Sequence, residues 1–341
     1  MPPILEVENL VKKYGDFAAV KGISFSVEEG EVFGLLGPNG AGKTQSISML
    51  TGVIPPTSGT ARIGGYDIHE DMDEVKKING LVPQDLALYP TLSARVNLNF
   101  FGRIYGIRGK QLKARVKDVL NIIALTERAD QAIEKYSGGM KRRVNIGAGL
   151  IHQPRLLFLD EPTVGVDPQS RNRIFESVMQ LNREQGMSII YPSHYMEEVE
   201  LLCNRVAIID EGQIIALDTI KNLIAMLGGG VIYVGLHQVD DALLESLSNL
   251  DGVDHASLAP QPVMPAAADQ GGPPSGEPGD QPPAPETKSE VVKIECEDNQ
   301  RALISIISFA GEHDLTITSL EILEPNLESV FLHLTGKKLR E

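Results

Sequence analysis

The stretch Gly37-Pro38-Asn39-Gly40-Ala41-Gly42-Lys43-Thr44 decides the fold, because it lies between an apolar run, Val32–Leu36, and a helical pattern over about Lys43–Leu50. Its glycines let backbone N–H groups close around phosphate oxygens, and the following helix adds the positive end of its dipole. Lys43 supplies a charge to the phosphates, and the Thr44 hydroxyl can bind Mg²⁺. A strand, loop and helix in this order predict a nucleotide-binding site, in preference to a glycine-rich turn that only connects two elements.

Apolar runs alternate with helical patterns up to about residue 225, which is typical of a sheet of parallel strands covered by helices. A helix is expected over Gln169–Glu184. The segment Leu92–Leu125 is mostly helical and interrupts the alternation, so we predict an inserted helical subdomain within an α/β core. The buried strands that carry this prediction are Val32–Leu36, Leu156–Leu159, Ser188–Tyr191 and Val206–Ile209.

Two adjacent carboxylates, Asp160 and Glu161, follow the apolar run Leu156–Leu159 directly. Ligands of open α/β sheets bind at the carboxyl ends of the strands, so this position favours a catalytic role. We expect Asp160 to hold Mg²⁺, directly or through water, and Glu161 to act as general base toward the attacking water. The alternative is a pair of acidic residues at an ordinary turn, where Asp is common.

A third motif, Tyr136-Ser137-Gly138-Gly139-Met140, precedes a helical pattern over Lys141–Leu150. A helix that opens with Ser-Gly-Gly offers free N–H groups and a positive dipole end to an anion. By itself the motif is more typical of an N-capped helix after a glycine turn.

In this order, the three motifs resemble those of the ATP-binding subunit of an ABC transporter, whose signature is usually Leu-Ser-Gly-Gly-Gln. The resemblance implies a P-loop ABC ATPase core over residues 1–225, with a helical subdomain at about 85–150. It also implies that Ser137, Gly138 and Gly139 contact the γ-phosphate of ATP held by a second subunit. Met140 and Tyr136 depart from the usual signature residues at their positions.

Further matches extend the resemblance along residues 1–225. Tyr14 matches an aromatic residue that stacks on adenine, and Gln84 matches a glutamine that reaches Mg²⁺ and couples the site to the transporter. Asp167 matches the loop that crosses the dimer interface, and His194 matches a histidine that contacts the γ-phosphate and serves catalysis. With ATP and Mg²⁺ as cofactors, the implied ATP-binding residues are Tyr14, Gly37, Pro38, Asn39, Gly40, Ala41, Gly42, Lys43, Thr44 and Gln45. Thr44, Gln84 and Asp160 are the implied Mg²⁺ ligands. Gln45 stands where a hydroxyl residue is common.

The whole chain of 341 residues has a net charge of −15, which argues against sequence-independent binding of nucleic acid. No segment approaches the ~20 continuous apolar residues of a membrane-spanning helix, and the N-terminus shows no secretory signal. The two cysteines, Cys203 and Cys296, are expected to be thiols of a reducing cytoplasm. With these features, the resemblance to an ABC transporter subunit implies a peripheral protein at the cytoplasmic face of the cell membrane.

The composition changes near residue 259. Of the 28 residues from Pro260 to Thr287, 9 are Pro and 4 are Gly, and none is Ile, Leu or aromatic. Such a segment buries too little apolar surface to offset its ordering entropy, so we predict a disordered insertion over 259–287. Residues 226–258 and 288–341 are expected to form a small C-terminal α+β accessory domain. Its predicted strands are Val231–Leu236, Val291–Glu295 and Leu315–Leu323, and its predicted helices are Asp241–Leu250 and Asn299–Gly311.

The resemblance implies an ATPase that drives export of a small molecule, lipid or glycan through separate polytopic membrane subunits. Its cassettes would form a homodimer or a cassette heterodimer, and the docking surface would lie within Gln84–Ile107. Segments such as Leu86–Leu92 and Phe100–Gly106 look like the branch of drug, antibiotic and polysaccharide exporters. The alternatives are a soluble ABC ATPase that acts on nucleic acid or ribosomes, and a regulatory or assembly ATPase without transport.

Overall fold

The computed structural model describes residues 2–237, 239–259, 290–296, 298–323 and 325–336. Contacts divide the chain into two compact units, Met1–Leu223 with Phe331–Glu341, and Ile224–Val330. The sequence analysis assigned all of 288–341 to the accessory domain, whereas the contacts assign the described residues 331–336 to the first unit. The predicted disordered insertion lies outside the described residues, apart from Ala259.

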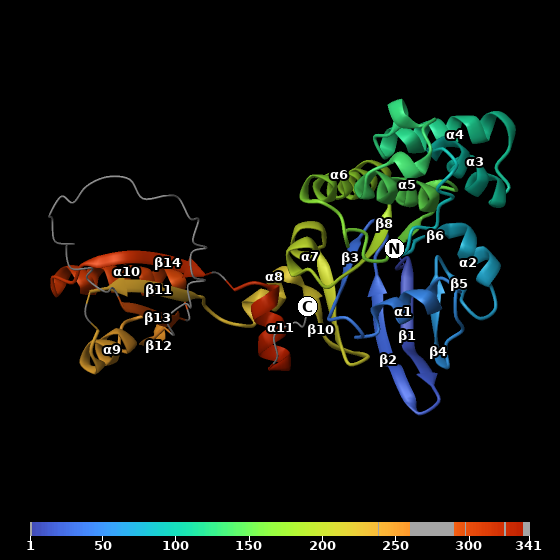
Figure 1. Ribbon diagram of the computed structural model, residues 1–341. Coiled ribbons are helices and arrows are strands. Elements are labelled where there is room, and N and C mark those ends of the chain that lie inside the picture. The colour runs from blue at the N-terminus through green and yellow to red at the C-terminus, as the bar shows by residue number, and fades with distance from the viewer. Residues whose placement is uncertain (1, 238, 260–289, 297, 324, 337–341) are drawn as a thin grey trace, which may run out of the picture. The chain divides into compact units, whose positions relative to one another are not determined.

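A six-stranded sheet with the order β10-β9-β3-β8-β7-β6 forms the centre of the first unit (Figure 1). Neighbouring strands from β9 to β6 are parallel, and β10 runs antiparallel to β9. All four predicted parallel strands are present, and β6 and β10 are additions to the prediction. The strands are β3 (Val32–Leu36), β6 (Asn79–Val82), β7 (Leu156–Leu159), β8 (Ser188–Ser193), β9 (Arg205–Asp210) and β10 (Gln213–Thr219).

A second sheet of the first unit is antiparallel, with the order β2-β1-β4-β5. One buried apolar cluster joins side chains of both sheets and of helix α1 (Lys43–Leu50), among them Leu5, Phe33 and Ile47. This cluster fixes the helix that follows the phosphate loop between the two sheets. The strands of the second sheet are β1 (Leu5–Tyr14), β2 (Phe17–Val27), β4 (Ser58–Ile63) and β5 (Tyr66–Asp67).

The predicted helical subdomain consists of α3 (Ala94–Ile104), α4 (Gly109–Ile122) and α5 (Gly138–Leu150), which gather at one end of the unit (Figure 1). A Cβ added to Gly147 of α5 would lie 2.9 Å from Val119 Cγ1 of α4, so glycine permits the close approach of these two helices. The remaining helices of the unit are α2 (Met72–Ile78), α6 (Pro168–Gln185), α7 (Met196–Leu202) and α8 (Ile220–Ala225), with 3₁₀ turns at Thr126–Arg128 and Ile133–Lys135.

The second unit follows the order β-α-β-β-α-β around an antiparallel sheet, β12-β13-β11-β14, which is the ferredoxin-like arrangement. Its core contains Ile232, Val292, Ile294 and Ile306, which are all buried. The strand β12 was absent from the prediction. The elements are β11 (Val231–Leu236), α9 (Asp241–Ser248), β12 (Val253–Leu258), β13 (Glu290–Cys296), α10 (Asn299–Glu312) and β14 (Ile317–Leu323). Helix α11 (Leu327–Thr335) follows and is divided between the two units after Val330.

Candidate functional site

The phosphate loop connects β3 to α1, as predicted, and two of its glycines are required by the backbone. Gly42 has a φ of 104°, a conformation that side chains disfavour, and a Cβ on Gly37 would lie 2.2 Å from the carbonyl oxygen of Ile209. No side chain caps α1, and no acidic residue lies in its first turn. The N–H groups at the start of α1 are therefore available to an anion.

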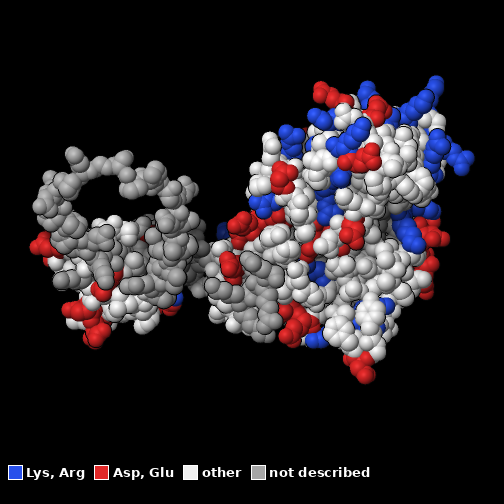
Figure 2. Space-filling model, in the orientation of Figure 1, with Lys and Arg blue, Asp and Glu red and all other residues white. Residues whose placement is uncertain are grey.

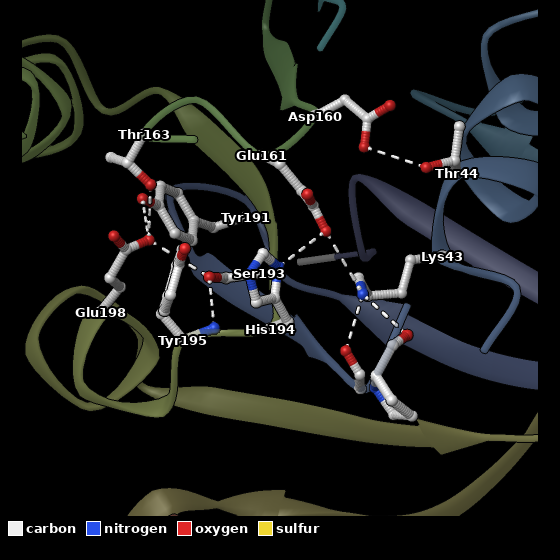
Figure 3. A network of polar contacts seen from close by, with 12 residues as sticks. Lys43, Thr44, Asp160, Glu161, Thr163, Tyr191, Ser193, His194, Tyr195 and Glu198 are labelled. Carbon is white, nitrogen blue, oxygen red and sulfur yellow. Dashed lines mark hydrogen bonds and ion pairs between the residues drawn. The ribbon is translucent and has the colours of Figure 1, made fainter. Parts of the chain in front are cut away.

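Lys43, the first residue of α1, is buried at the centre of this loop. Its Nζ donates to the carbonyl oxygens of Gly37 at 2.6 Å and Pro38 at 3.1 Å, and lies 3.4 Å from Glu161 Oε1 (Figure 3). Burial lowers the pKa of Lys43, and the charge of Glu161 acts against this shift. Phosphate oxygens would replace the lost hydration of the ammonium group, so the position suits a polyphosphate ligand.

The two predicted carboxylates lie side by side at the end of β7 and point in different directions (Figure 3). Thr44 Oγ1 donates to Asp160 Oδ1 at 3.4 Å, which brings together two of the predicted Mg²⁺ ligands. Burial raises the pKa of Asp160, and the neighbouring charge of Glu161 raises it further. Gln84, which follows β6, lines the same cavity as Thr44.

Glu161 adopts a left-handed backbone conformation, with a φ of 44°, and is 7% exposed. Its Oε1 lies 3.1 Å from Nδ1 of His194, which follows the end of β8. Since an ionised carboxylate only accepts hydrogen bonds, His194 Nδ1 donates in this contact. Glu161 is thus held by Lys43 on one side and His194 on the other, as Figure 3 shows.

These side chains open onto a cavity of about 630 Å³. Tyr14 lies at its rim, half-exposed, and its hydroxyl donates to Gln45 Oε1 at 2.8 Å. The Lys12 ammonium group lies 5.2 Å from the centre of the Tyr14 ring. Phe17, which is 67% exposed, also lines the cavity and was missed by the sequence analysis. The further lining residues are Ala19, Asn39, Gly40, Gly42, Lys43, Thr44, Gln84, Glu161, Val164, His194 and Tyr195.

Ser137 does not line this cavity within its own chain. It caps α5 by accepting from the Met140 N–H at 3.3 Å, and it borders a second hollow of about 540 Å³. Gly139 is packed so closely that an added Cβ would lie 2.1 Å from the Ser170 side chain. Asp167 caps α6 by accepting from the Ser170 N–H at 2.9 Å, and this contact lowers the pKa of Asp167. The predicted signature residues and the phosphate loop therefore form two separate surfaces.

A buried network around Glu198 lies behind the predicted catalytic side chains and was not predicted itself. Glu198 Oε2 accepts from Thr163 Oγ1 at 2.9 Å, from the Tyr191 hydroxyl at 2.9 Å and from Ser193 Oγ at 3.2 Å (Figure 3). These bonds join the loop after Glu161 to the strand that carries His194. In the sequence, Glu198 is one of two consecutive glutamates, and nothing there distinguishes the buried one from the exposed one.

Residues 20–164 match the family model described as "ABC transporter". The chain is 44% identical to the linearmycin resistance ATP-binding protein LnrL of Bacillus subtilis (strain 168), over 99% of this chain and 100% of that protein. It is 34% identical to the daunorubicin resistance ATP-binding protein DrrA2 of Streptomyces coeruleorubidus, over 98% and 95% of the two chains. The Nod factor export ATP-binding protein I of Ralstonia nicotianae (strain ATCC BAA-1114 / GMI1000) is 33% identical, over 99% and 96%.

Among solved structures, cbiO1 from Clostridium perfringens, part of the ABC transporter complex cbiONQ, matches with a TM-score of 0.61 and 30% identity. The match covers 66% of this chain and 92% of cbiO1. The dimeric ATP-binding cassette MJ0796, bound to ADP and Pi in a post-hydrolysis state, shares the fold at 24% identity, with a TM-score of 0.57 over 63% and 98% of the chains.

The names of the three relatives agree with the exporter-type ATPase that the motifs predict. Among the described residues, no helix combines the length and the apolar character needed to cross a membrane. The fold, the cavity at the phosphate loop and the relatives together show that this chain belongs to the ABC transporter family, as an ATP-binding and ATP-hydrolysing subunit of an exporter.

Proposed function

We propose that two cassettes, either two copies of this chain or this chain with a related one, face each other head to tail around two ATP molecules. In each site, Lys43 of one subunit would bind the phosphates, and Ser137 of the other would close over the γ-phosphate. The support is geometric: Ser137 lies on a different surface from Lys43 in its own chain, yet it begins a helix suited to bind an anion.

Hydrolysis is assigned to Glu161, and the observation that carries this assignment is its shared contact with Lys43 and His194. With ATP bound, the Lys43 ammonium group and the His194 imidazole would both turn to the phosphate oxygens, which attract them more strongly than one carboxylate does. Glu161 would then be free to accept the proton of the attacking water, as a general base must. His194 would stabilise the charge on the γ-phosphate.

Mg²⁺ fits the oxygen atoms that border the phosphate loop. Thr44 Oγ1 and Asp160 Oδ1 are already within 3.4 Å of each other, and Gln84 lines the same cavity. Mg²⁺ is usually bound by one or two protein oxygens together with phosphates and water. The ion would neutralise charge on the β- and γ-phosphates.

The membrane subunits would dock on the surface that contains Gln84 and helix α3. Val96, Phe100 and Ile104 are exposed and four residues apart, so they form one apolar stripe along α3. Figure 2 shows Lys and Arg gathered over α3 and α4, where Arg103 and Arg108 border a further hollow. An exposed apolar stripe of this kind marks a protein interface. Docked in this way, the cassette would lie at the cytoplasmic face of the membrane.

The cargo is proposed from the relatives, which are named for linearmycin resistance, daunorubicin resistance and Nod factor export. We infer that this chain powers export of a small molecule of the antibiotic type, or of a lipid or glycan. Deletion of the chain should raise the sensitivity of its host to the exported compound. A deletion strain with unchanged sensitivity to every antibiotic of a broad panel would contradict an antibiotic cargo.

The head-to-tail arrangement can be tested by crosslinking two different variants. Asn39→Cys lies on the phosphate loop and Ser137→Cys on the signature surface, and both positions are exposed. A mixture of the two variants with ATP should form a disulfide-linked dimer, because each loop faces the partner's signature surface. Neither variant alone should form this dimer. A mixture of either variant with the exposed control Lys76→Cys should not form it either. Crosslinking of the control mixture at the same rate would contradict the arrangement.

A further inference from the structure

Arg142 lies on α5, five residues after Ser137, and is only 3% exposed. Its guanidinium group donates four hydrogen bonds, all to backbone carbonyl oxygens of other segments. Nη1 donates to Pro83 at 2.9 Å and Gln84 at 2.7 Å. Nη2 donates to Glu161 at 2.6 Å, and Nε donates to Pro162 at 2.8 Å.

The four carbonyls belong to the two loops that carry Gln84 and Glu161. Arg142 is thus a single rigid bridge between the signature helix and two loops that line the ATP cavity of the same chain. The guanidinium group of Arg142 is planar and carries five N–H donors, so it can reach both loops at once. A lysine ammonium group is a compact point charge and does not have this fork. The carbonyl that accepts from Nη2 belongs to Glu161, whose backbone is left-handed with a φ of 44°.

The neighbouring residue Asn145 provides a useful contrast. It is also buried on α5, where its Nδ2 donates to the Pro83 carbonyl at 3.1 Å and its Oδ1 accepts from the Ala87 N–H at 3.1 Å. Asn145 therefore holds only the loop of Gln84. Of these two side chains, Arg142 is the one that reaches the loop of Glu161.

We propose that Arg142 is a positioning residue that couples the two ATP sites of the dimer. This inference rests on the proposed role of Ser137 at the partner's ATP. When Ser137 engages that ATP, α5 moves as a rigid element, and Arg142 carries the movement to the backbone of Glu161. The base of one site is then placed for catalysis only when the other site is filled.

The test compares Arg142→Lys with Asn145→Ala in steady-state ATP hydrolysis by the intact chain. Lysine keeps the positive charge and loses the fork, so kcat should fall about a hundredfold, the cost of a small misplacement of a catalytic group. The KM for ATP should change less than about threefold, because the phosphate loop is untouched. For the unsubstituted chain, the Hill coefficient for ATP should lie above 1, below the limit of about 2 that two sites allow. For Arg142→Lys it should fall to about 1.

Asn145→Ala should keep the Hill coefficient of the unsubstituted chain, because its bonds do not reach Glu161. An Arg142→Lys variant that keeps its Hill coefficient would overturn the inference, whatever its kcat. If Arg142→Lys fails to fold, Arg142→Gln, which retains two N–H donors, replaces it with the same readouts. A Hill coefficient of about 1 in the unsubstituted chain would also overturn the coupling while leaving the ATPase assignment intact. Failure of the proposed catalytic role would appear separately, as normal turnover by Glu161→Gln.

Discussion

Glu161 and His194 meet across the ends of two parallel strands, with Oε1 of the carboxylate 3.1 Å from Nδ1 of the imidazole. Lys43 Nζ lies 3.4 Å from the same oxygen. Two partners that contact one oxygen fix the direction of the Glu161 side chain. The carboxylate is therefore oriented toward the cavity by contacts within one chain.

Glu161→Gln should preserve ATP binding and abolish most hydrolysis. The amide occupies nearly the same volume and can still accept from Lys43, but it cannot take a proton from water. We expect kcat to fall roughly a thousandfold, within the range that general bases contribute. The ATP-bound dimer should accumulate, because it reopens only after hydrolysis, and size-exclusion chromatography with ATP would detect it.

The matched control is Glu197→Gln, which removes the same charge from an exposed position on α7. It should hydrolyse ATP at the rate of the unsubstituted chain. If Glu161→Gln stays monomeric at saturating ATP and turns over normally, Glu161 is not the base.

Ser137→Arg should block hydrolysis and leave nucleotide binding to the isolated subunit unchanged. The long cationic side chain would occupy the surface proposed to close over the partner's γ-phosphate, whereas the phosphate loop of the same chain lines a separate cavity. Fluorescent ATP titration of the monomer and steady-state hydrolysis provide the two readouts. Because the Ser137 hydroxyl also caps α5, Ser137→Ala serves as the comparison that removes the hydroxyl, at about 1 kcal/mol of stability for the lost cap, without adding a long cation. Lost binding in the monomeric Arg variant would show that Ser137 acts on its own ATP.

The sequence predicted the parallel sheet well, because its strands are short apolar runs buried on both faces. β7, for instance, is buried at all four positions from Leu156 to Leu159. The antiparallel sheet was missed because its strands are mixed: β1 alternates buried Leu5 and Val7 with exposed Glu6 and Glu8 and then loses the alternation. Register shifts in its pairing with β2 account for that irregular pattern.

The carboxylates and His194 were placed correctly at strand ends, since parallel strands bring such residues to one edge of the sheet. Arg142 and Glu198 could not be found in this way. Their partners are backbone carbonyls and hydroxyls from distant segments, so their roles depend on tertiary packing and leave no local pattern. Phe17 was missed for the same reason, because only the pairing of β1 with β2 brings it beside Tyr14.

Tyr14→Ala should weaken ATP binding without changing kcat. The ring lies at the rim of the cavity, where it can stack on adenine, and loss of one stacking contact with a base costs about 1–3 kcal/mol, or roughly 5- to 150-fold in affinity. Tyr14→Phe keeps the ring and removes only the bond to Gln45, so it should bind ATP almost as the unsubstituted chain does. Equal losses in the Ala and Phe variants would assign the effect to the hydroxyl rather than to stacking.

Asp160→Asn should stabilise the nucleotide-free chain at neutral pH while it abolishes Mg²⁺-dependent hydrolysis. Burial raises the pKa of Asp160, so the folded chain binds its proton more tightly than the unfolded chain does. Stability therefore falls as pH rises from the unfolded pKa to the raised folded pKa, and the ionised group remains a cost above that window. Asparagine cannot ionise and avoids this cost, but it is a poor ligand for Mg²⁺.

Thermal unfolding of Asp160→Asn without nucleotide should show a higher Tm than that of the unsubstituted chain at pH 7, and the two Tm values should converge in acid. Asp73→Asn, at an exposed position on α2, should change neither Tm nor hydrolysis. A lower Tm for Asp160→Asn at pH 7 would mean that the bond from Thr44 outweighs the cost of burying the charge.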